Sequence, residues 1–511
     1  MSKTRKQKEE QLLRRISDGF AVLFSTVFLL MPPFLGYQKT TTVRYPLYLI
    51  LCGGYVFLCA VITFAFFLIG IGEKPKKPRE KAPFLFRFFC LALLFYVLWT
   101  VLSSLFSPYD GTFWGLGRKD GVLNVLILTG TAFFLACNFR PKRWMLLPFG
   151  ISLTLFCLFS FLQFAGLNPL GLYPGDYTFY DGFFAYAGQY FGTLGNSDFC
   201  AAVLALGAGI SEAVLIRRKT RAELLFVPCL FFTVSALLFC FVEAGIAALL
   251  LGTVLVLIFA VRSAAHLFRA VSMLGVLALA GGAVTAFPCS VDGISCRFSV
   301  SALALLLAGI LLSGIGICGA RFGAKLRFSV KRYRTVTLSL FAAGLAAGIV
   351  SLRFWNGAQS GTLFEIHEML CGRWDDTFGS GRIYIWRQTL QKLWERPIFG
   401  GGPDTLSLRG LEPFRRIRED GSVITRTIDA AHCEYLNVAV NQGIPALLAY
   451  LTAIGTAAAA WIRSESDTAA IAGAGALFYL IDAIFGISFF VSTPYLWVCL
   501  GLLMGTVRRH G

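Results

Sequence analysis

The sequence contains few charged side chains and very few histidines. Charged residues make up 14% of the 511 residues, and only four residues are histidines. A soluble globular chain carries about 25% charged residues, so the deficit excludes an ordinary soluble domain. The 14 cysteines include no CxxC pair and no Cys/His cluster. The sequence therefore gives no reason to expect a metal site, and no cofactor is predicted.

In place of charge, the sequence has a series of long apolar runs. Hydrophobic residues make up 56% of the chain, grouped in runs of about 18 to 25 residues, long enough to cross roughly 30 Å of hydrocarbon. The runs predict an all-α fold: a polytopic integral membrane bundle of about 14 transmembrane helices. The predicted spans are 19–36, 46–71, 84–107, 121–139, 145–165, 197–216, 224–242, 244–262, 270–288, 299–320, 336–352, 444–462, 469–487 and 494–507.

The net charge of +18 is better explained by membrane topology than by nucleic acid, and no nucleic-acid partner is predicted. Lys and Arg gather in every second short connection, for example in residues 73–81, 140–143, 217–221 and 321–334. Such connections stay on the cytoplasmic side. We therefore expect a multi-pass protein of the cytoplasmic membrane with both termini in the cytoplasm.

Two connections on the opposite, extracytoplasmic side are long, at about 166–196 and 353–443. Connections longer than about 15 residues are usually functional or disordered, and the second is too aromatic for disorder. The expected organisation has three regions. Residues 1–352 form an N-terminal transmembrane bundle of about 11 helices. Residues 353–443 form a large extracytoplasmic loop domain, and residues 444–511 form the C-terminal transmembrane helices.

One stretch of the long loop has the pattern of an amphipathic helix. Ser380 is the predicted N-cap, and Pro397 with the following glycines ends the helix. The expected apolar face consists of Ile383, Trp386, Leu390, Leu393 and Trp394. A helix lying in the membrane interface explains that face, but it does not explain Arg382 at the helix start, where a cation gains nothing from the helix dipole. A bound anion would benefit from Arg382 together with the free N–H groups.

From Thr377 to Thr427 the loop carries nine Lys or Arg and five acids. A solvated surface and a site for phosphate or pyrophosphate both fit this excess, and arginine suits the second because its planar fork can bind two oxygens. Residues 400–402 are all glycine, which fits a turn better than a backbone nest for an anion.

The sequence "AHCEYLN" at residues 431–437 contains His432 and Glu434 just before an apolar run. A helix starting near Asp429 would point these two side chains about 200° apart. His432 fits either a histidine hydrogen-bonded to a loop or a base at a reacting hydroxyl. Spacing alone does not decide between them. Acids in apolar runs usually face a cavity or a partner; Asp482 is expected near the face of His432, whereas Glu212 is expected to extend its carboxylate to the interface.

Several of these stretches resemble the O-antigen ligase and polysaccharide polymerase family. The family pattern has an arginine, a tryptophan four residues later, a Pro–hydrophobic–Phe/Leu–Gly–x–Gly turn, and a histidine before the next membrane helix. This chain supplies Arg382, Trp386, Pro397, Gly400, Gly402 and His432 at those places. Family-like stretches also occur at 115–124, 190–206 and 486–505, so the resemblance covers most of the chain.

The resemblance implies a helical membrane enzyme of cell-envelope polysaccharide biosynthesis. Its donor would be a glycan on a polyprenyl (undecaprenyl) pyrophosphate carrier, and its acceptor a hydroxyl of a glycan, lipid or protein at the outer face of the membrane. Membrane lipids are further expected partners, and neither a cofactor nor a metal is implied. A ligase and a polymerase differ only in the acceptor, which the sequence does not identify.

The resemblance also implies roles for individual residues. Arg382, assisted by Arg387 or Arg396, would bind the pyrophosphate, and His432 would position or deprotonate the acceptor, with Glu434 as a second candidate base. The expected supporting residues are Trp386, Asn196, Gln189, Arg118 and Asp482. Two positions depart from the family pattern: Cys433 stands where asparagine is usual, and Gln189 stands where an arginine is common. Arg118 is a candidate replacement for that arginine.

Two other functions remain open at this point. A transporter or flippase of a lipid-linked glycan predicts broken helices and charges near the membrane midplane, whereas here the polar residues gather at one face. A divergent, non-catalytic member of the family is the other alternative.

Overall fold

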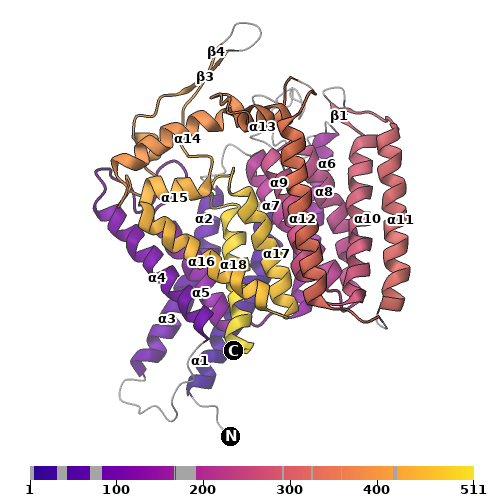
Figure 1. The fold of residues 1–511 in the computed structure, drawn as a ribbon. Helices are drawn as coiled ribbons and strands as arrows, with labels where there is room; N and C mark the ends of the chain where they lie inside the picture. Colours follow the sequence, from indigo (N-terminus) through magenta and orange to yellow (C-terminus); the bar gives the residue numbers. More distant parts are fainter. Residues whose placement is uncertain are drawn as a thin grey trace.

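The computed structural model of the protein describes residues 5–30, 43–69, 83–165, 167, 192–290, 293–323, 326–357, 359–417 and 423–510. Figure 1 shows a bundle of helices that run between two faces. One face carries α13 (Thr362–Leu370), α14 (Phe378–Glu395) and the hairpin of β3 (Phe414–Ile417) and β4 (Val423–Arg426). We call it the α14 face. Both ends of the chain lie at the opposite face.

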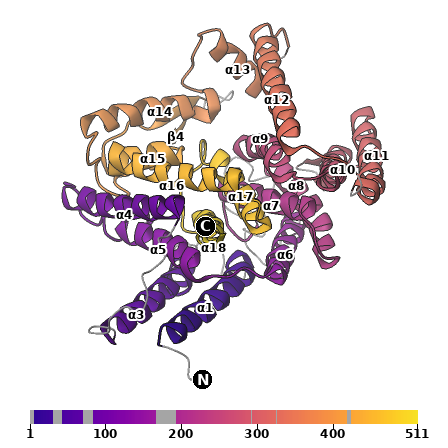
Figure 2. The same ribbon diagram turned by 60° about the horizontal axis from the view of Figure 1, so that its bottom comes forward.

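The predicted fold class is confirmed. Ten of the described helical segments are long and apolar enough to cross a membrane, and α5 is a shorter apolar helix. A helix lies in each of the predicted spans, and Figure 2 shows them grouped around α18 in a view towards the opposite face. The bundle consists of α1 (Arg5–Leu23), α2 (Tyr45–Tyr48), α3 (Gly54–Ile69), α4 (Phe84–Leu105), α5 (Val122–Asn138), α6 (Leu146–Phe164), α7 (Ser197–Ile216), α8 (Phe226–Phe239), α9 (Glu243–Ala260), α10 (Ala264–Ala286), α11 (Val300–Gly323), α12 (Val330–Arg353), α16 (Ile444–Arg463), α17 (Asp467–Asp482) and α18 (Thr493–His510).

Short elements complete the described chain. A hairpin of β1 (Cys289–Ser290) and β2 (Gly293–Ile294) connects α10 to α11. The helix α15 (Glu434–Gln442) lies between β4 and α16. Brief π-helical turns extend α1 (Phe24–Phe28) and α2 (Leu49–Gly53), and 3-10 turns precede α6 (Arg143–Met145) and α8 (Ala222–Leu225) or follow α14 (Leu406–Leu408).

The core of the bundle is α7, which is buried along its whole length. It packs against α8, α9 and α17, and small residues make this close packing possible. A Cβ on Gly209 would lie 2.8 Å from the carbonyl oxygen of Ala474 and 2.6 Å from the ring of Phe478. Glu212 is completely buried in α7 and accepts a hydrogen bond from Thr253 Oγ1 at 2.7 Å. The expectation that its carboxylate reaches the interface is therefore wrong, because α7 is central and has no lipid-facing side.

The periphery is formed by α11 and α12, whose side chains are mostly exposed. The helix α11 contacts α10 closely along a row of small residues. A Cβ on Gly316 would lie 2.5 Å from the carbonyl oxygen of Phe268, so the backbones of α10 and α11 touch. Close contact of this kind is typical of helix pairs in membranes.

Candidate functional site

Arg382 is the first residue of the regular part of α14. The three preceding residues Gly379, Ser380 and Gly381 have positive φ angles of 61°, 60° and 88°, so the chain is kinked there. Ser380 lies inside this kink and is not the helix N-cap that its position in the sequence predicts. The kink fixes Arg382: its Nη1 donates to the carbonyl oxygen of Gly379 at 2.9 Å, and its Nε to that of Phe485 at 3.2 Å.

Both of these acceptors of Arg382 are neutral. Among the described residues no carboxylate forms an ion pair with this guanidinium, although many other arginines here have one. The positive charge is thus held in a defined place without being neutralised. Such a group is suited to binding an anion.

The rest of α14 packs differently from the expected pattern. Its buried positions are Gly381, Ile385, Thr389 and Leu393, which recur every four residues, whereas Leu390 and Trp394 are 43% and 68% exposed. The buried face thus combines one glycine, one threonine and two aliphatic residues, whereas Leu390 and Trp394 face outwards. The exposed apolar side chains of Leu390 and Trp394 fit contact with the membrane interface.

Arg387 and Arg396, of which one or the other was expected to assist Arg382, make contacts of their own. Arg387 is exposed and pairs with Asp376. Arg396, 14 residues after Arg382, lies about 21 Å away along the helix at 1.5 Å per residue, and donates to the carbonyl oxygen of Phe106 at 3.5 Å. Arg382 acts electrostatically on His432, whereas the contacts described for Arg387 and Arg396 lie elsewhere.

His432 lies before α15 and not inside it, because α15 begins at Glu434. Its φ of 48° is a left-handed conformation that costs a non-glycine residue about 1–3 kcal/mol and often marks a functional site. Burial, and then the charge of Arg382, lower the pKa of His432 to about 4, although Asp198 acts in the opposite direction. At neutral pH the imidazole is therefore uncharged and able to accept a proton.

Glu434, the second candidate base, points into the protein. The residue is 3% exposed, and its carboxylate accepts hydrogen bonds from Tyr450 Oη at 2.6 Å and Tyr479 Oη at 3.1 Å. Burial raises the pKa of Glu434. These contacts tie α15 to α16 and α17. The geometry fits a structural role for Glu434 better than a role as a base.

The segment formed by the last residue of α17 and the turn that follows it, residues 482–485, contacts the start of α14 and the start of α15; we call it the turn after α17. The Phe485 carbonyl accepts from Arg382, its ring stacks on Trp386 at 6.0 Å between centroids, and Ala483 O accepts from Glu434 N at 2.9 Å. Asp482 in the same turn is 3% exposed. Its Oδ1 has no hydrogen-bond partner among the described residues, and it lies within electrostatic range of Arg382 and Asp198.

Arg118 approaches the site from the loop between α4 and α5. Its Nη2 donates to both carboxylate oxygens of Asp429 at 2.8 Å, so its charge is largely neutralised, in contrast to Arg382. The backbone N–H groups of Arg118 and Asp120 donate to Asp404 Oδ2 at 3.1 and 3.4 Å. Asp404 was not singled out from the sequence; its left-handed φ of 60° is visible only in the structure.

Asp120 and Asp404 place two carboxylates close together in a buried region. Burial, followed by the charge of Asp404, raises the pKa of Asp120 to about 7. The folded state therefore holds a proton on Asp120 that the unfolded chain, with a pKa near 3.8, releases. Stability contributed by this proton is present below about pH 4 and is lost as the pH rises to about 7.

We expect the variant Asp120→Asn to abolish that pH dependence. The amide keeps an oxygen for the hydrogen bond from Asn124 Nδ2 (2.9 Å) but never ionises. The melting temperature of the variant should exceed that of the wild type at pH 8 and match it at pH 4. Thermal unfolding in detergent at the two pH values measures this. An equal difference at both values would show that ionisation of Asp120 does not matter.

Asn196 has a clear structural role. It caps α7, with its Oδ1 accepting from the N–H groups of Asp198 and Phe199 at 2.8 and 3.4 Å. The cap places Asp198 in the first turn of α7, within electrostatic range of His432.

Gln189 lies outside the described residues. Arg44 is a further cation near the start of α7. It is 7% exposed and within electrostatic range of Cys200. It was not singled out from the sequence, because it belongs to none of the motifs considered there.

The glycines after α14 form a turn packed on α15, as expected. Gly401 N donates to Val440 O at 3.1 Å and Gly402 N to Asn441 O at 2.8 Å. Since these N–H groups are already hydrogen-bonded to carbonyls, they cannot form a nest for an anion. Arg409 is 6% exposed and binds the carbonyls of Val440 (3.0 Å) and Lys392, which joins α14 to α15.

Within electrostatic range of one another lie Arg382, a cation with no ion-pair partner in the described part of the chain, and His432, a neutral imidazole, with Asp198 and Asp482 also acting on this region. The first can bind an anionic group, and the second can accept a proton from a neighbouring hydroxyl. The described residues contain no group of three His, Cys, Asp or Glu side chains that could hold a metal ion.

Comparison with known protein families gives one match. Residues 289–451 match the family model described as O-Antigen ligase, which confirms the resemblance found in the sequence. The matched region includes α14, Arg382, His432 and Glu434. No curated protein matches the chain.

Proposed function

The chain carries an O-antigen ligase domain over residues 289–451, and from that premise we propose a specific reaction. The domain indicates a multi-pass membrane protein with a glycosyltransferase-type function in polysaccharide biosynthesis. We propose that the protein transfers a glycan from a polyprenyl (undecaprenyl) pyrophosphate carrier to an acceptor hydroxyl. The α14 face would lie at the outer side of the cytoplasmic membrane.

The observation that supports this proposal is that Arg382, held by the Phe485 carbonyl in the turn after α17, lies within electrostatic range of His432. In the reaction, the acceptor oxygen attacks the anomeric carbon of the donor sugar. The bond from that carbon to the pyrophosphate oxygen breaks, and the polyprenyl pyrophosphate leaves with the electron pair. His432 would take the proton of the hydroxyl, and Arg382 would stabilise the charge that develops on the pyrophosphate.

The proposed orientation rests on the distribution of basic residues. The helix ends and connections at the opposite face (Figure 1) include four arginines, Arg143, Arg217, Arg262 and Arg463. Positive charge in short connections favours the cytoplasmic side. A polyprenyl-linked glycan presented from outside would then reach the α14 face.

The decisive experiment uses the full-length protein in liposomes with a polyprenyl-pyrophosphate glycan and candidate acceptors. We expect a new glycosidic bond on one acceptor and release of polyprenyl pyrophosphate, both detected by mass spectrometry. Movement of the intact lipid-linked glycan across the bilayer without bond formation would instead indicate a transporter. If neither occurs with any acceptor, the chain is a non-catalytic member of the family.

The lowered pKa of His432 gives a prediction for the pH–rate profile. The folded-state pKa of about 4 keeps the imidazole neutral well below 6.5, where an unperturbed histidine gains its proton. We expect the transfer rate to stay level from pH 8 down to about pH 5.5. The profile of Asp120→Asn serves as a control, because Asp120 itself titrates near 7. A fall in rate with a midpoint near 6.5 in both proteins would contradict the neutral-base role.

A further inference from the structure

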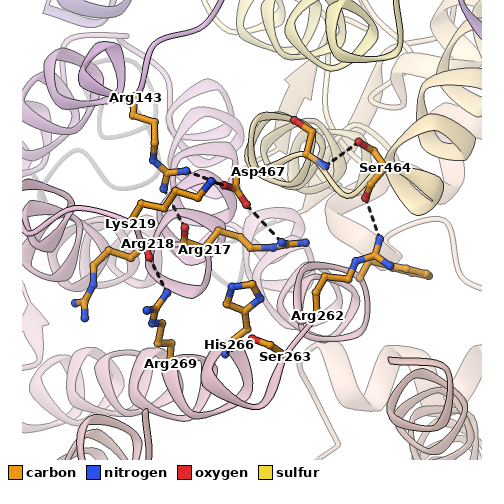
Figure 3. A network of polar contacts seen from close by, with 12 residues as sticks. Arg143, Arg217, Arg218, Lys219, Arg262, Ser263, His266, Arg269, Ser464 and Asp467 are labelled. Atoms are coloured by element: carbon orange, nitrogen blue, oxygen red, sulfur yellow. Dashed lines mark hydrogen bonds and ion pairs between the residues drawn. The ribbon is translucent and has the colours of Figure 1, made fainter. Parts of the chain in front are cut away.

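The face opposite to α14 has a second concentration of charge. The helix α7 has 20 residues, so at 1.5 Å per residue its two ends lie about 30 Å apart. Asp198 is at the end near His432, and Arg217 follows the other end. Around Arg217 lie cations from several helix ends, which we call the Arg217 cluster (Figure 3). Figure 3 labels six of its members, Arg143, Arg217, Lys219, Arg262, His266 and Arg269. The seventh is Arg334, which lies within electrostatic range of Arg217 and Arg262.

Arg217 itself is 5% exposed, and Figure 3 shows its guanidinium between Asp467 and Arg262. Its Nη1 reaches Asp467 Oδ1 at 3.4 Å, which is a weak contact. Its Nε and Nη2 are buried and have no hydrogen-bond partner among the described residues. Since a buried cationic donor is costly to leave unpaired, these two nitrogens point to a missing acceptor.

Neighbouring side chains of the cluster have the same deficiency. The Nε atoms of Arg262, Arg269 and Arg334 are also buried without a partner in the described part of the chain, as is Nδ1 of His266. The hydrogen bonds that these arginines do make go to backbone carbonyls: Arg262 Nη2 binds Ser464 O at 2.9 Å, and Arg269 Nη1 binds Arg218 O at 2.6 Å.

The charges of the cluster do not balance. Six cationic residues, Arg143, Arg217, Lys219, Arg262, Arg269 and Arg334, face three carboxylates, those of Glu223, Glu465 and Asp467. Glu223 is engaged by Arg143 through two hydrogen bonds of 2.5 and 2.7 Å. Burial and then the charges of Arg334 and Arg217 lower the pKa of Arg262 to about 10, which reflects the excess of positive charge around it.

Membrane topology alone does not account for this arrangement. Basic residues that set topology need only lie in a connection and can stay solvated. Capping of helix C-termini explains the carbonyl contacts of Arg262 and Arg334, but it leaves the buried nitrogens of Arg217 without an acceptor. A ligand with several anionic oxygens would supply acceptors for these nitrogens and offset the charge excess at the same time.

An apolar cavity of about 130 Å³ lies next to the cluster, between α1, α6, α7, α17 and α18. Arg143 belongs both to the wall of this cavity and to the Arg217 cluster, and Lys142 and Thr468 lie in the same wall. A lipid with an acyl chain in the cavity would therefore hold its headgroup beside Arg143 and Asp467. This adjacency makes a phospholipid one source of the anionic group, and free phosphate the other.

We propose that the Arg217 cluster is a binding site for a phosphate group, with the buried Nε and Nη2 of Arg217 as donors to its oxygens. The site lies on the face opposite to the proposed transfer site and does not depend on it. A bound phosphate would link the end of α7, the starts of α10 and α12, and the connection between α16 and α17.

The test uses the full-length protein, stripped of lipid and purified in a non-ionic detergent. One arm measures thermal unfolding in inorganic phosphate against chloride at equal ionic strength. The other arm measures retention of phosphatidic acid by native mass spectrometry after reconstitution in phosphatidylcholine nanodiscs with and without that lipid. We expect saturable binding in at least one arm. Stabilisation by inorganic phosphate identifies a free-anion site, and retention of phosphatidic acid alone identifies a headgroup site.

The matched variants are Arg217→Gln and Arg321→Gln. Both remove one positive charge near the same face, but Arg321 is an exposed residue in the last turn of α11. We expect Arg217→Gln to weaken binding at least about tenfold and Arg321→Gln to leave it unchanged. Should Arg217→Gln not fold, Arg262→Gln carries the same expectation. No binding by the wild type in either arm, or equal binding by all variants, overturns the proposal.

Discussion

Replacing Arg382 with alanine is expected to slow glycan transfer about 10²–10³-fold, which is the usual effect of removing one preorganised donor at a developing charge. The guanidinium is held by the carbonyls of Gly379 and Phe485 and has no acidic partner among the described residues. Its charge therefore remains available to the leaving pyrophosphate. The measurement is the initial rate of product formation in liposomes at saturating donor.

The matched control is Arg387→Ala, one and a half turns along the same helix. Arg387 is 58% exposed in its side chain and pairs with Asp376, so its charge is already balanced by a carboxylate. We expect this variant to transfer glycan at close to the wild-type rate. A loss of the same size in both variants would mean that general positive charge on the loop matters, and not the position of Arg382.

The melting temperature of Arg382→Ala separates catalysis from folding. Removing the side chain loses two hydrogen bonds to carbonyls, each worth about 1 kcal/mol, so the protein should remain folded. A variant that binds the lipid-linked donor more weakly and melts near the wild-type temperature would support the proposed contact with pyrophosphate. Wild-type transfer by Arg382→Ala would refute the assigned role.

Hydropathy predicted the membrane helices well because one physical requirement dominates them. A segment that crosses hydrocarbon must be long, apolar and helical, and these properties are local in the sequence. The exact residues at which the helices begin and end are harder to predict from local hydropathy. Arg334 was expected in a connection, but α12 begins at Val330, since a long basic side chain can extend past the apolar region from the first turn of a helix.

The candidate site could be predicted only in part. The sequence indicated Arg382 and His432 through their places beside a helix start and an apolar run. It did not indicate that Glu434 turns inward to Tyr450 and Tyr479. This orientation depends on packing against α16 and α17, which the sequence pattern around Glu434 does not reveal.

The turn after α17 is the clearest case of such a dependence. Residues 482–485 bind both Arg382 and the backbone of Glu434, although about 50 to 100 residues separate them in the chain. Phe485 and Ala483 make these contacts through backbone carbonyls. Every residue has a backbone carbonyl, so the residue type does not indicate such a contact. Periodicity and composition therefore could not predict that this turn positions the site.

Substituting Gly443 with alanine is expected to destabilise the α14 face by about 3–5 kcal/mol. Gly443 joins α15 to α16 with φ 91° and ψ 163°, a region that only glycine adopts readily. A Cβ there would lie 1.9 Å from the carbonyl oxygen of Ile398 and 2.5 Å from its carbonyl carbon. Both atoms are backbone, so no side chain can move aside to relieve the clash.

Two hydrogen bonds prevent the turn at the end of α14 from moving away from that Cβ. Ile398 O accepts from Trp99 Nε1 at 3.0 Å, and Pro397 O accepts from Ile444 N at 2.8 Å. A shift large enough to admit the methyl group would break at least one of these hydrogen bonds and displace α14. We therefore expect Gly443→Ala to lower the melting temperature and, by moving Arg382, to slow transfer as well.

Gly455→Ala provides the matched control twelve residues later, in the interior of α16. A Cβ at Gly455 would have no atom within 4 Å, and alanine is favoured over glycine in a helix interior by up to about 1 kcal/mol. This variant should melt at or slightly above the wild-type temperature and keep full activity. If Gly443→Ala melts no lower than Gly455→Ala, the packing of the α14 turn against the junction of α15 and α16 is wrong, and with it the support for Arg382 beside His432.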